Sequence, residues 1–187
     1  MQMQIFRRGV LGLIALGLTV SMLAIFGCGG SDDDGETQRT ANLRGSNERP
    51  TPLPNVTGSG TVVLTINDDQ TEIQYVLTYT GLNNVTQAHI HAGSADVAGP
   101  VVLFYCTNIG GAPAGAVGGQ ACPQGSSVTV SGTLKAVDLS CKDATPTSPA
   151  VQSFADAIAQ LKAGNTYTNV HSQANPGGDI RGTDIVQ

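Results

Sequence analysis

Hydrophobic and polar residues alternate along two neighbouring stretches of the chain, residues 61–66 and 73–79. Every second residue in these stretches is apolar, at Val62, Leu64, Ile66, Ile73, Tyr75, Leu77 and Tyr79. A period of two places the apolar side chains on one face of a β-strand. The polar segment 67–70 has a turn composition, so the two stretches are predicted to form an antiparallel hairpin.

Further short apolar segments, separated by clusters of Gly, Pro and Asn, are also predicted as strands. They are residues 40–47, 86–92, 100–106, 126–136, 165–172 and 179–186. About eight short strands with frequent turns are typical of an all-β fold, either an antiparallel β-sandwich or a Greek-key barrel.

One segment, residues 149–163, has helical rather than strand periodicity. Its apolar stripe consists of Val151, Phe154, Ala155, Ile158 and Leu161. Ser148 can cap the first turn, Pro149 suits its first position, and Gly164 can end the helix. We expect one amphipathic helix that packs its stripe on the core. The segment 107–125 is mostly Gly and Ala without periodicity, and is predicted to be a loop over one end of the sandwich.

The start of the chain resembles the export signal of bacterial lipoproteins. Arg7 and Arg8 precede an apolar run from residue 9 to 26, and Gly27-Cys28 follows. The run is almost long enough to span a membrane. However, the sequence Ile-Phe-Gly-Cys at 25–28 is similar to a lipobox, in which the Cys becomes the lipidated N-terminus. This resemblance implies a membrane contact through a lipid anchor on Cys28.

These features predict three parts: a signal peptide at 1–27, a lipidated Cys with an acidic tether at 28–39, and a β-sandwich domain at 40–187. Gly29 in place of an Asp favours the outer membrane of a bacterial cell envelope, facing either the periplasm or the cell surface. The mature chain would have seven basic and fourteen acidic residues, a net charge of −7. Because no basic patch exists, nucleic acid and anionic membrane surfaces are excluded as partners.

With Cys28 assigned to the lipid, Cys106, Cys122 and Cys141 remain. Two of them should pair in an oxidising compartment, and three pairings are open. We favour Cys106–Cys122, because it closes the Gly/Ala-rich loop at its two ends and leaves Cys141 free.

The three histidines of the chain lie in two motifs. His89 and His91 stand in Ala-His-Ile-His-Ala at 88–92, and His171 stands in Tyr-Thr-Asn-Val-His-Ser at 167–172, which is followed by Gly-Asp-Ile-Arg-Gly at 178–182. These motifs and their separation resemble the CHRD family, first described in chordin, over roughly residues 40–186. The resemblance implies a secreted β-sandwich domain whose biochemical role is unsettled.

Alternate residues of a strand point to the same face, so His89 and His91 should project side by side about 6–7 Å apart. A His-x-His pair with one distant His can form a three-imidazole site for Cu or Zn. The pair also resembles that of copper–zinc superoxide dismutases, although further ligands of that enzyme have no counterpart. In the alternative interpretation, the imidazoles only form structural hydrogen bonds with neighbouring groups.

Asn169, Asp179 and Arg181 complete the closing motif and are interpreted as structural. Asp179 and Arg181 flank Ile180 on one face, and Glu48 is another possible partner for Arg181. The leading hypothesis is therefore a non-enzymatic, membrane-anchored binding or structural module with an unknown extracytoplasmic partner. The alternatives are a copper- or zinc-binding protein and a superoxide-dismutase-like redox enzyme. No catalytic motif with serine, paired carboxylates or His-Glu-x-x-His is present.

Overall fold

A computed structural model describes residues 37–140 and 151–185 of the chain. Its described residues form eight strands, one α-helix and three short 3-10 helices. The strands are β1 (Thr37–Arg44), β2 (Ser59–Ile66), β3 (Ile73–Thr80), β4 (Val85–Ala92), β5 (Val101–Thr107), β6 (Ser127–Leu134), β7 (Thr166–Ser172) and β8 (Ile180–Thr183); the helices are η1 (Gly45–Asn47), η2 (Val117–Gly119), η3 (Ala136–Asp138) and α1 (Phe154–Lys162). The all-β prediction is confirmed.

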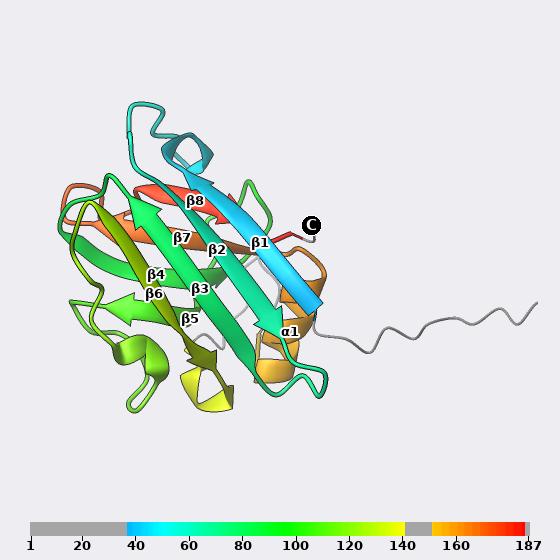
Figure 1. The fold of residues 1–187 in the computed structure, drawn as a ribbon. Helices are drawn as coiled ribbons and strands as arrows, with labels where there is room; N and C mark the ends of the chain where they lie inside the picture. Colours follow the sequence, from blue (N-terminus) through cyan, green and yellow to red (C-terminus); the bar gives the residue numbers. More distant parts are fainter. Residues whose placement is uncertain (1–36, 141–150, 186–187) are drawn as a thin grey trace, which may run out of the picture. The chain divides into compact units, whose positions relative to one another are not determined.

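The eight strands make one antiparallel sheet in the order β5-β4-β7-β8-β1-β2-β3-β6. The sheet folds over on itself into a nearly closed barrel with two layers (Figure 1). One layer contains β1, β2, β3 and β6, and the other contains β8, β7, β4 and β5. The layers join at β1 and β8, whose ladder has one residue pair, Arg44 with Arg181, and at a bridge between Thr40 and Ile185.

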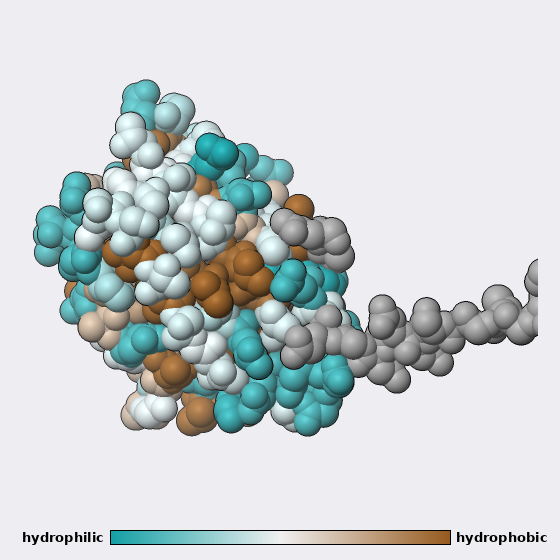
Figure 2. Space-filling model, in the orientation of Figure 1, coloured by the Kyte–Doolittle hydropathy of each residue, from teal (hydrophilic) through white to brown (hydrophobic). Residues whose placement is uncertain are grey.

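The predicted antiparallel hairpin is formed by β2 and β3, with Ile66 opposite Ile73 and Leu64 opposite Tyr75. The apolar side chains point inward and form the core between the layers. Figure 2 shows that residues of intermediate hydropathy make up much of the outer face of this layer, with a hydrophobic patch near its centre and hydrophilic residues mainly around its rim. Val76, which lies on this face, is 48% exposed.

The helix is shorter than predicted, because it begins at Phe154 and not near residue 149. Ser153 is the capping residue: its hydroxyl accepts a hydrogen bond from the amide of Asp156, and the Asp156 carboxylate accepts one from the amide of Ser153. This reciprocal capping box fixes the start of the helix. The predicted cap, Ser148, lies outside the described residues.

Three strands are shorter than the sequence predicts. Residues 45–47 turn into η1, the strand predicted at 126–136 ends at Leu134, and β8 ends at Thr183 and not near residue 186. Gly45 lies at a crowded point, since a Cβ there would come within 2.8 Å of the side chain of Val56. The chain can bend out of the sheet at this point because glycine has no side chain.

The predicted disulfide between Cys106 and Cys122 is confirmed. It holds the loop after β5 against that strand, together with hydrogen bonds between Asn108 and the backbone of Cys122. Cys28, Cys141 and the segments predicted as signal peptide and tether up to residue 36 lie outside the described residues. Within the described part of the chain, no helix has the length and apolar character needed to cross a membrane.

Candidate metal centre

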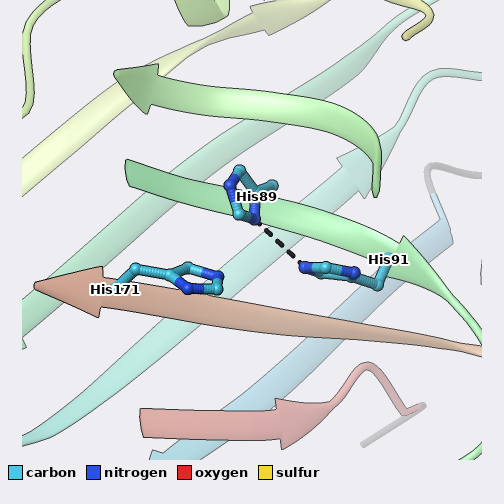
Figure 3. A group of neighbouring side chains, drawn as sticks. All are labelled: His89, His91 and His171. Atoms are coloured by element: carbon cyan, nitrogen blue, oxygen red, sulfur yellow. Dashed lines mark hydrogen bonds between the residues drawn. The ribbon is translucent and has the colours of Figure 1, made fainter. Parts of the chain in front are cut away.

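The three histidines lie on the outer face of the layer that contains β4 and β7. Along β4, Ala88, Ile90 and Ala92 point into the core, so His89 and His91 point outward. His171 projects from the neighbouring strand β7 on the same side, as Figure 3 shows. Each of the three side chains is nevertheless at most 9% exposed. Loops therefore cover this outer face and create a second, polar interior.

The three rings converge. The Nδ1 of His89 lies 3.1 Å from the Nε2 of His91, and one nitrogen from each of the three rings lies within 4.8 Å of the other two. The ring centroids of His89 and His171 are 4.6 Å apart. We call His89, His91 and His171 the three-His site. The prediction that a His-x-His pair meets the distant histidine agrees with this geometry.

Two rings donate their N–H to a backbone carbonyl outside the site. His91 uses Nδ1 to reach the oxygen of Gly99 at 2.8 Å, and His171 uses Nδ1 to reach the oxygen of Pro176 at 2.9 Å. A carbonyl oxygen only accepts, so each Nδ1 must carry the proton. In both rings, a neutral imidazole then leaves Nε2 unprotonated and available as a ligand.

The third ring, that of His89, is oriented by Gln87. The amide nitrogen of Gln87 donates to the carbonyl of Gly110 at 2.7 Å, so its amide oxygen faces Nε2 of His89 at 3.2 Å. This oxygen can only accept, which places the His89 proton on Nε2 and leaves Nδ1 bare. The outward hydrogen bonds thus use the single N–H of every neutral ring.

With the His89 proton on Nε2, the inner nitrogens face one another without a proton between them, and the 3.1 Å contact between His89 Nδ1 and His91 Nε2, dashed in Figure 3, joins two lone pairs. The other neutral tautomer of His89 would donate its Nδ1–H to His91 Nε2 and give up the 3.2 Å bond to Gln87. In both tautomers His171 Nε2 is buried without any hydrogen-bond partner. Leaving buried polar atoms unpaired costs about 1–3 kcal/mol each. A cation among the three nitrogens would remove this cost.

Protonation of one of the rings would also place a positive charge among the three nitrogens, but the pKa values of the rings oppose it. Burial lowers the pKa of His89 to about 2 and the pKa of His91 to about 4, and it also lowers the pKa of His171. The neighbouring rings lower the pKa of His89 further, since two imidazolium ions would repel each other. The rings are neutral at physiological pH, which is the form that binds metals.

The distances suit Cu or Zn. Metal–nitrogen bonds of about 2.0–2.1 Å in a tetrahedral arrangement place the nitrogens about 3.3 Å apart. The pair His89 and His91 already has this spacing. The three ring nitrogens lie up to 4.8 Å apart, so the rings would have to move by roughly 1–1.5 Å to bring all three to the spacing of a tetrahedral site.

Tyr167 and Arg181 form a layer behind His91. The rings of His91 and Tyr167 stack with centroids 4.7 Å apart, and the Arg181 guanidinium carbon lies 3.3 Å from the centroid of Tyr167. Arg181 donates to the carbonyls of Ser94, Ala95 and Val97, rather than to the carboxylates of Asp179 or Glu48 that the sequence suggested. It thereby holds the loop that supplies the Gly99 carbonyl to His91.

The other members of the closing motif lie next to this layer. Asn169 donates to Glu48 at 2.7 Å, and one oxygen of Asp179 accepts from the side chain of Asn175. The supporting roles of Gln87, Gly99 and Pro176 were not predicted. Gln87 shares the face of His89 two residues away, which is a usable signal, whereas a backbone carbonyl leaves no trace in a sequence.

Comparisons with known proteins agree with the sequence motifs. The family model of the CHRD domain matches residues 39–183, which is most of the chain. No curated protein and no solved structure gave a significant match. The match includes β1 from Arg39 onward, all of β2 to β8, and the three histidines of the three-His site. The chain therefore belongs to the CHRD domain family.

Proposed function

We propose that this CHRD domain is a non-enzymatic binding module that holds a copper or zinc ion through His89 Nδ1, His91 Nε2 and His171 Nε2. The observation that carries the proposal is the convergence of the three rings around inward-facing nitrogens: His91 and His171 donate Nδ1–H to backbone carbonyls and leave Nε2 bare, and His89 leaves Nδ1 bare when its proton faces Gln87. Hydrogen bonds on the far nitrogen are also what orients metal-binding histidines in proteins generally.

The donor set determines the metal class. Three imidazoles without a thiolate or carboxylate suit Zn and Cu, and disfavour Mg and Ca, which prefer oxygen. A bound ion would have room for a fourth ligand, such as water, because three protein ligands leave a tetrahedral position open. The protein itself supplies neutral rings, a fixed orientation and an environment from which water is mostly excluded.

The first prediction concerns metal affinity. Titration of the full-length protein in detergent with Cu(II) or Zn(II), followed by calorimetry, should show one site per chain. Replacing His91 by Ala should weaken binding at least tenfold, since removing a ligand costs no less than removing an outer-shell partner, which costs about 10–100-fold.

Gln74→Ala is a suitable control, because Gln74 is exposed on β3 in the other layer. This variant should bind metal as the unmodified protein does. Binding weaker than about 0.1 mM, or unchanged binding in the His91 variant, would return the histidines to a purely structural role. A superoxide assay on the copper-loaded protein tests the redox-enzyme alternative, for which significant turnover would be required.

We also propose that the domain is anchored to a bacterial cell envelope, in the outer membrane, by a lipid on Cys28. The support is the order of basic residues, apolar run and Gly27-Cys28 in the sequence. An oxidising compartment is also consistent with the disulfide of Cys106 and Cys122.

The second prediction tests the anchor. The unmodified protein should partition into the detergent phase after export, whereas Cys28→Ala should stay at the size of the precursor. The disulfide variant Cys122→Ala serves as a control, because it also removes one cysteine but leaves the processing site intact. Normal processing and anchoring of Cys28→Ala, measured by mobility and phase partitioning, would contradict the lipoprotein assignment.

A further inference from the structure

Three oxygen-bearing side chains gather beside the three-His site without belonging to it. Asn169 lies on β7, Asp179 directly precedes β8, and Glu48 follows η1. We call these residues the oxygen cluster. Their exposed fractions are 3%, 4% and 3%, so all three are buried. Asn169 pairs with Arg181 in the ladder between β7 and β8, which places Asp179 diagonally across from Asn169.

Two atoms of the oxygen cluster have unsatisfied bonding capacity. The Oδ1 of Asn169 and the Oδ2 of Asp179 are buried without a hydrogen-bond partner. Both are acceptors, and the only other buried side-chain atom without a partner in the described part of the chain is His171 Nε2. Buried polar atoms are normally paired, so unpaired acceptors on two adjacent strands point to a missing donor or cation.

The charges in the cluster are not neutralised by ion pairs. Among the residues that the structure describes, the ion pairs join Arg49 to Asp96 and Lys135 to Glu72, and neither involves the oxygen cluster. Burial raises the pKa of Glu48 to about 7, although the nearby Arg181 guanidinium opposes this shift by more than Asp179 adds to it. A positive charge next to these carboxyl groups would therefore be favourable.

The turn before β8 shapes a cradle around the same groups. Gly178 has a φ of +128°, and a Cβ at this position would lie 2.6 Å from Glu48 Oε2 and 2.7 Å from Asn169 Nδ2. Only glycine lets the backbone approach the cluster this closely. A hollow of about 310 Å³ opens beside Glu48, the one cluster residue that lines it, between residues 49–53 and the turn residues 174–178.

We propose that Glu48, Asn169 and Asp179 bind a hard divalent cation, Ca²⁺, at a second site distinct from the three-His site. Carboxylate and amide oxygens are the ligands that Ca²⁺ prefers, at about 2.3–2.6 Å. The ion needs six to eight ligands, and water in the hollow and carbonyls of the turn complete the set. Nitrogen ligands are absent from the oxygen cluster, so Cu and Zn have no preference for it over the three imidazoles.

The test is a titration of the full-length protein in detergent with CaCl₂. Calorimetry measures the binding, and the change in melting temperature is a second readout. Affinities in the range of about 0.1–1 mM are expected, as for extracellular Ca²⁺ modules. Asp179→Asn keeps the shape of the side chain but removes its charge, and should weaken Ca²⁺ binding at least tenfold. Asp179→Glu keeps the carboxylate and should bind within about tenfold of the unmodified protein.

Two controls separate this proposal from the proposed function. His91→Ala should retain Ca²⁺ binding, whether or not it has lost Cu or Zn. Glu72→Gln removes a partly exposed carboxylate that pairs with Lys135 beside β3, in the other layer of the sheet, and should leave Ca²⁺ binding unchanged. The proposal is overturned if the dissociation constant for Ca²⁺ is larger than about 10 mM, which is tenfold above the weak end of the expected range. It is equally overturned if Asp179→Asn binds as well as the unmodified protein, or if His91→Ala abolishes Ca²⁺ binding.

Discussion

Phe154→Ala should destabilise the domain by about 3–5 kcal/mol. Phe154 opens α1 and is 7% exposed, and it belongs to the core together with Ala157, Ile158 and Leu161 of the same helix. The substitution removes most of a large apolar side chain, and the surrounding residues relax only partly into the space. Urea unfolding followed by circular dichroism measures the loss.

The neighbouring residue Ala155 provides the control, because it is exposed, although the sequence pattern had placed it in the apolar stripe. Ala155→Ser should change stability by less than about 1 kcal/mol. If Phe154→Ala also cost less than about 1 kcal/mol, the helix would be loosely attached and would become a candidate interaction element. The buried positions of the helix predict the larger loss.

Alternation in the sequence predicted the strands best where one side of the sheet faces solvent. In β3, Ile73 and Leu77 point inward while Gln74 and Thr78 point outward, so buried and outward-facing residues alternate with a period of two. In β7 all seven residues are buried, because loops cover its outer face. The polar residues Asn169 and His171 therefore lie in an interior, which no hydropathy pattern indicates.

The candidate site was predicted in part for a similar reason. The spacing of His89 and His91 fixes their common face once they lie in a strand, so their proximity follows from local geometry. The contribution of His171 depended on the pairing of β4 with β7, which neither the periodicity nor the motifs specified. The protonation pattern depends on the carbonyls of Gly99 and Pro176, whose positions are set by loop conformations.

Nothing in the sequence pattern indicated that the core contains the carboxyl group of Asp184. It was predicted to lie within a strand at 179–186, but β8 ends at Thr183 and Asp184 is 0% exposed. The hydroxyls of Thr166 and Thr168 donate to its two oxygens, each at 2.9 Å. Neither ion pair in the described part of the chain includes Asp184. A single buried carboxyl group between two layers of strands has no signature in the sequence.

Asp184→Asn should therefore stabilise the metal-free domain at pH 8 and have little effect at pH 4. Burial raises the pKa of Asp184 from 3.8 to about 7, and the two threonine hydroxyls only partly oppose this. Between these values the folded protein keeps a proton that the unfolded chain releases, so stability decreases as pH rises towards 7. The full loss, present above pH 7, corresponds to about 4 kcal/mol for three pKa units.

Asparagine has nearly the same shape without the charge, so the variant avoids this loss, and its stability advantage at pH 8 should be up to about 4 kcal/mol. Because the amide group can accept from one threonine and donate to the other, the hydrogen bonds need not be lost. The histidines have the opposite effect: their lowered pKa values reduce stability below about pH 6.5. This effect is common to both proteins, so the difference between their urea unfolding midpoints, measured with a chelator from pH 4 to 8, isolates Asp184. A variant less stable than the unmodified protein at pH 8 would mean that the Asp184 carboxylate is ionised and well compensated in the core.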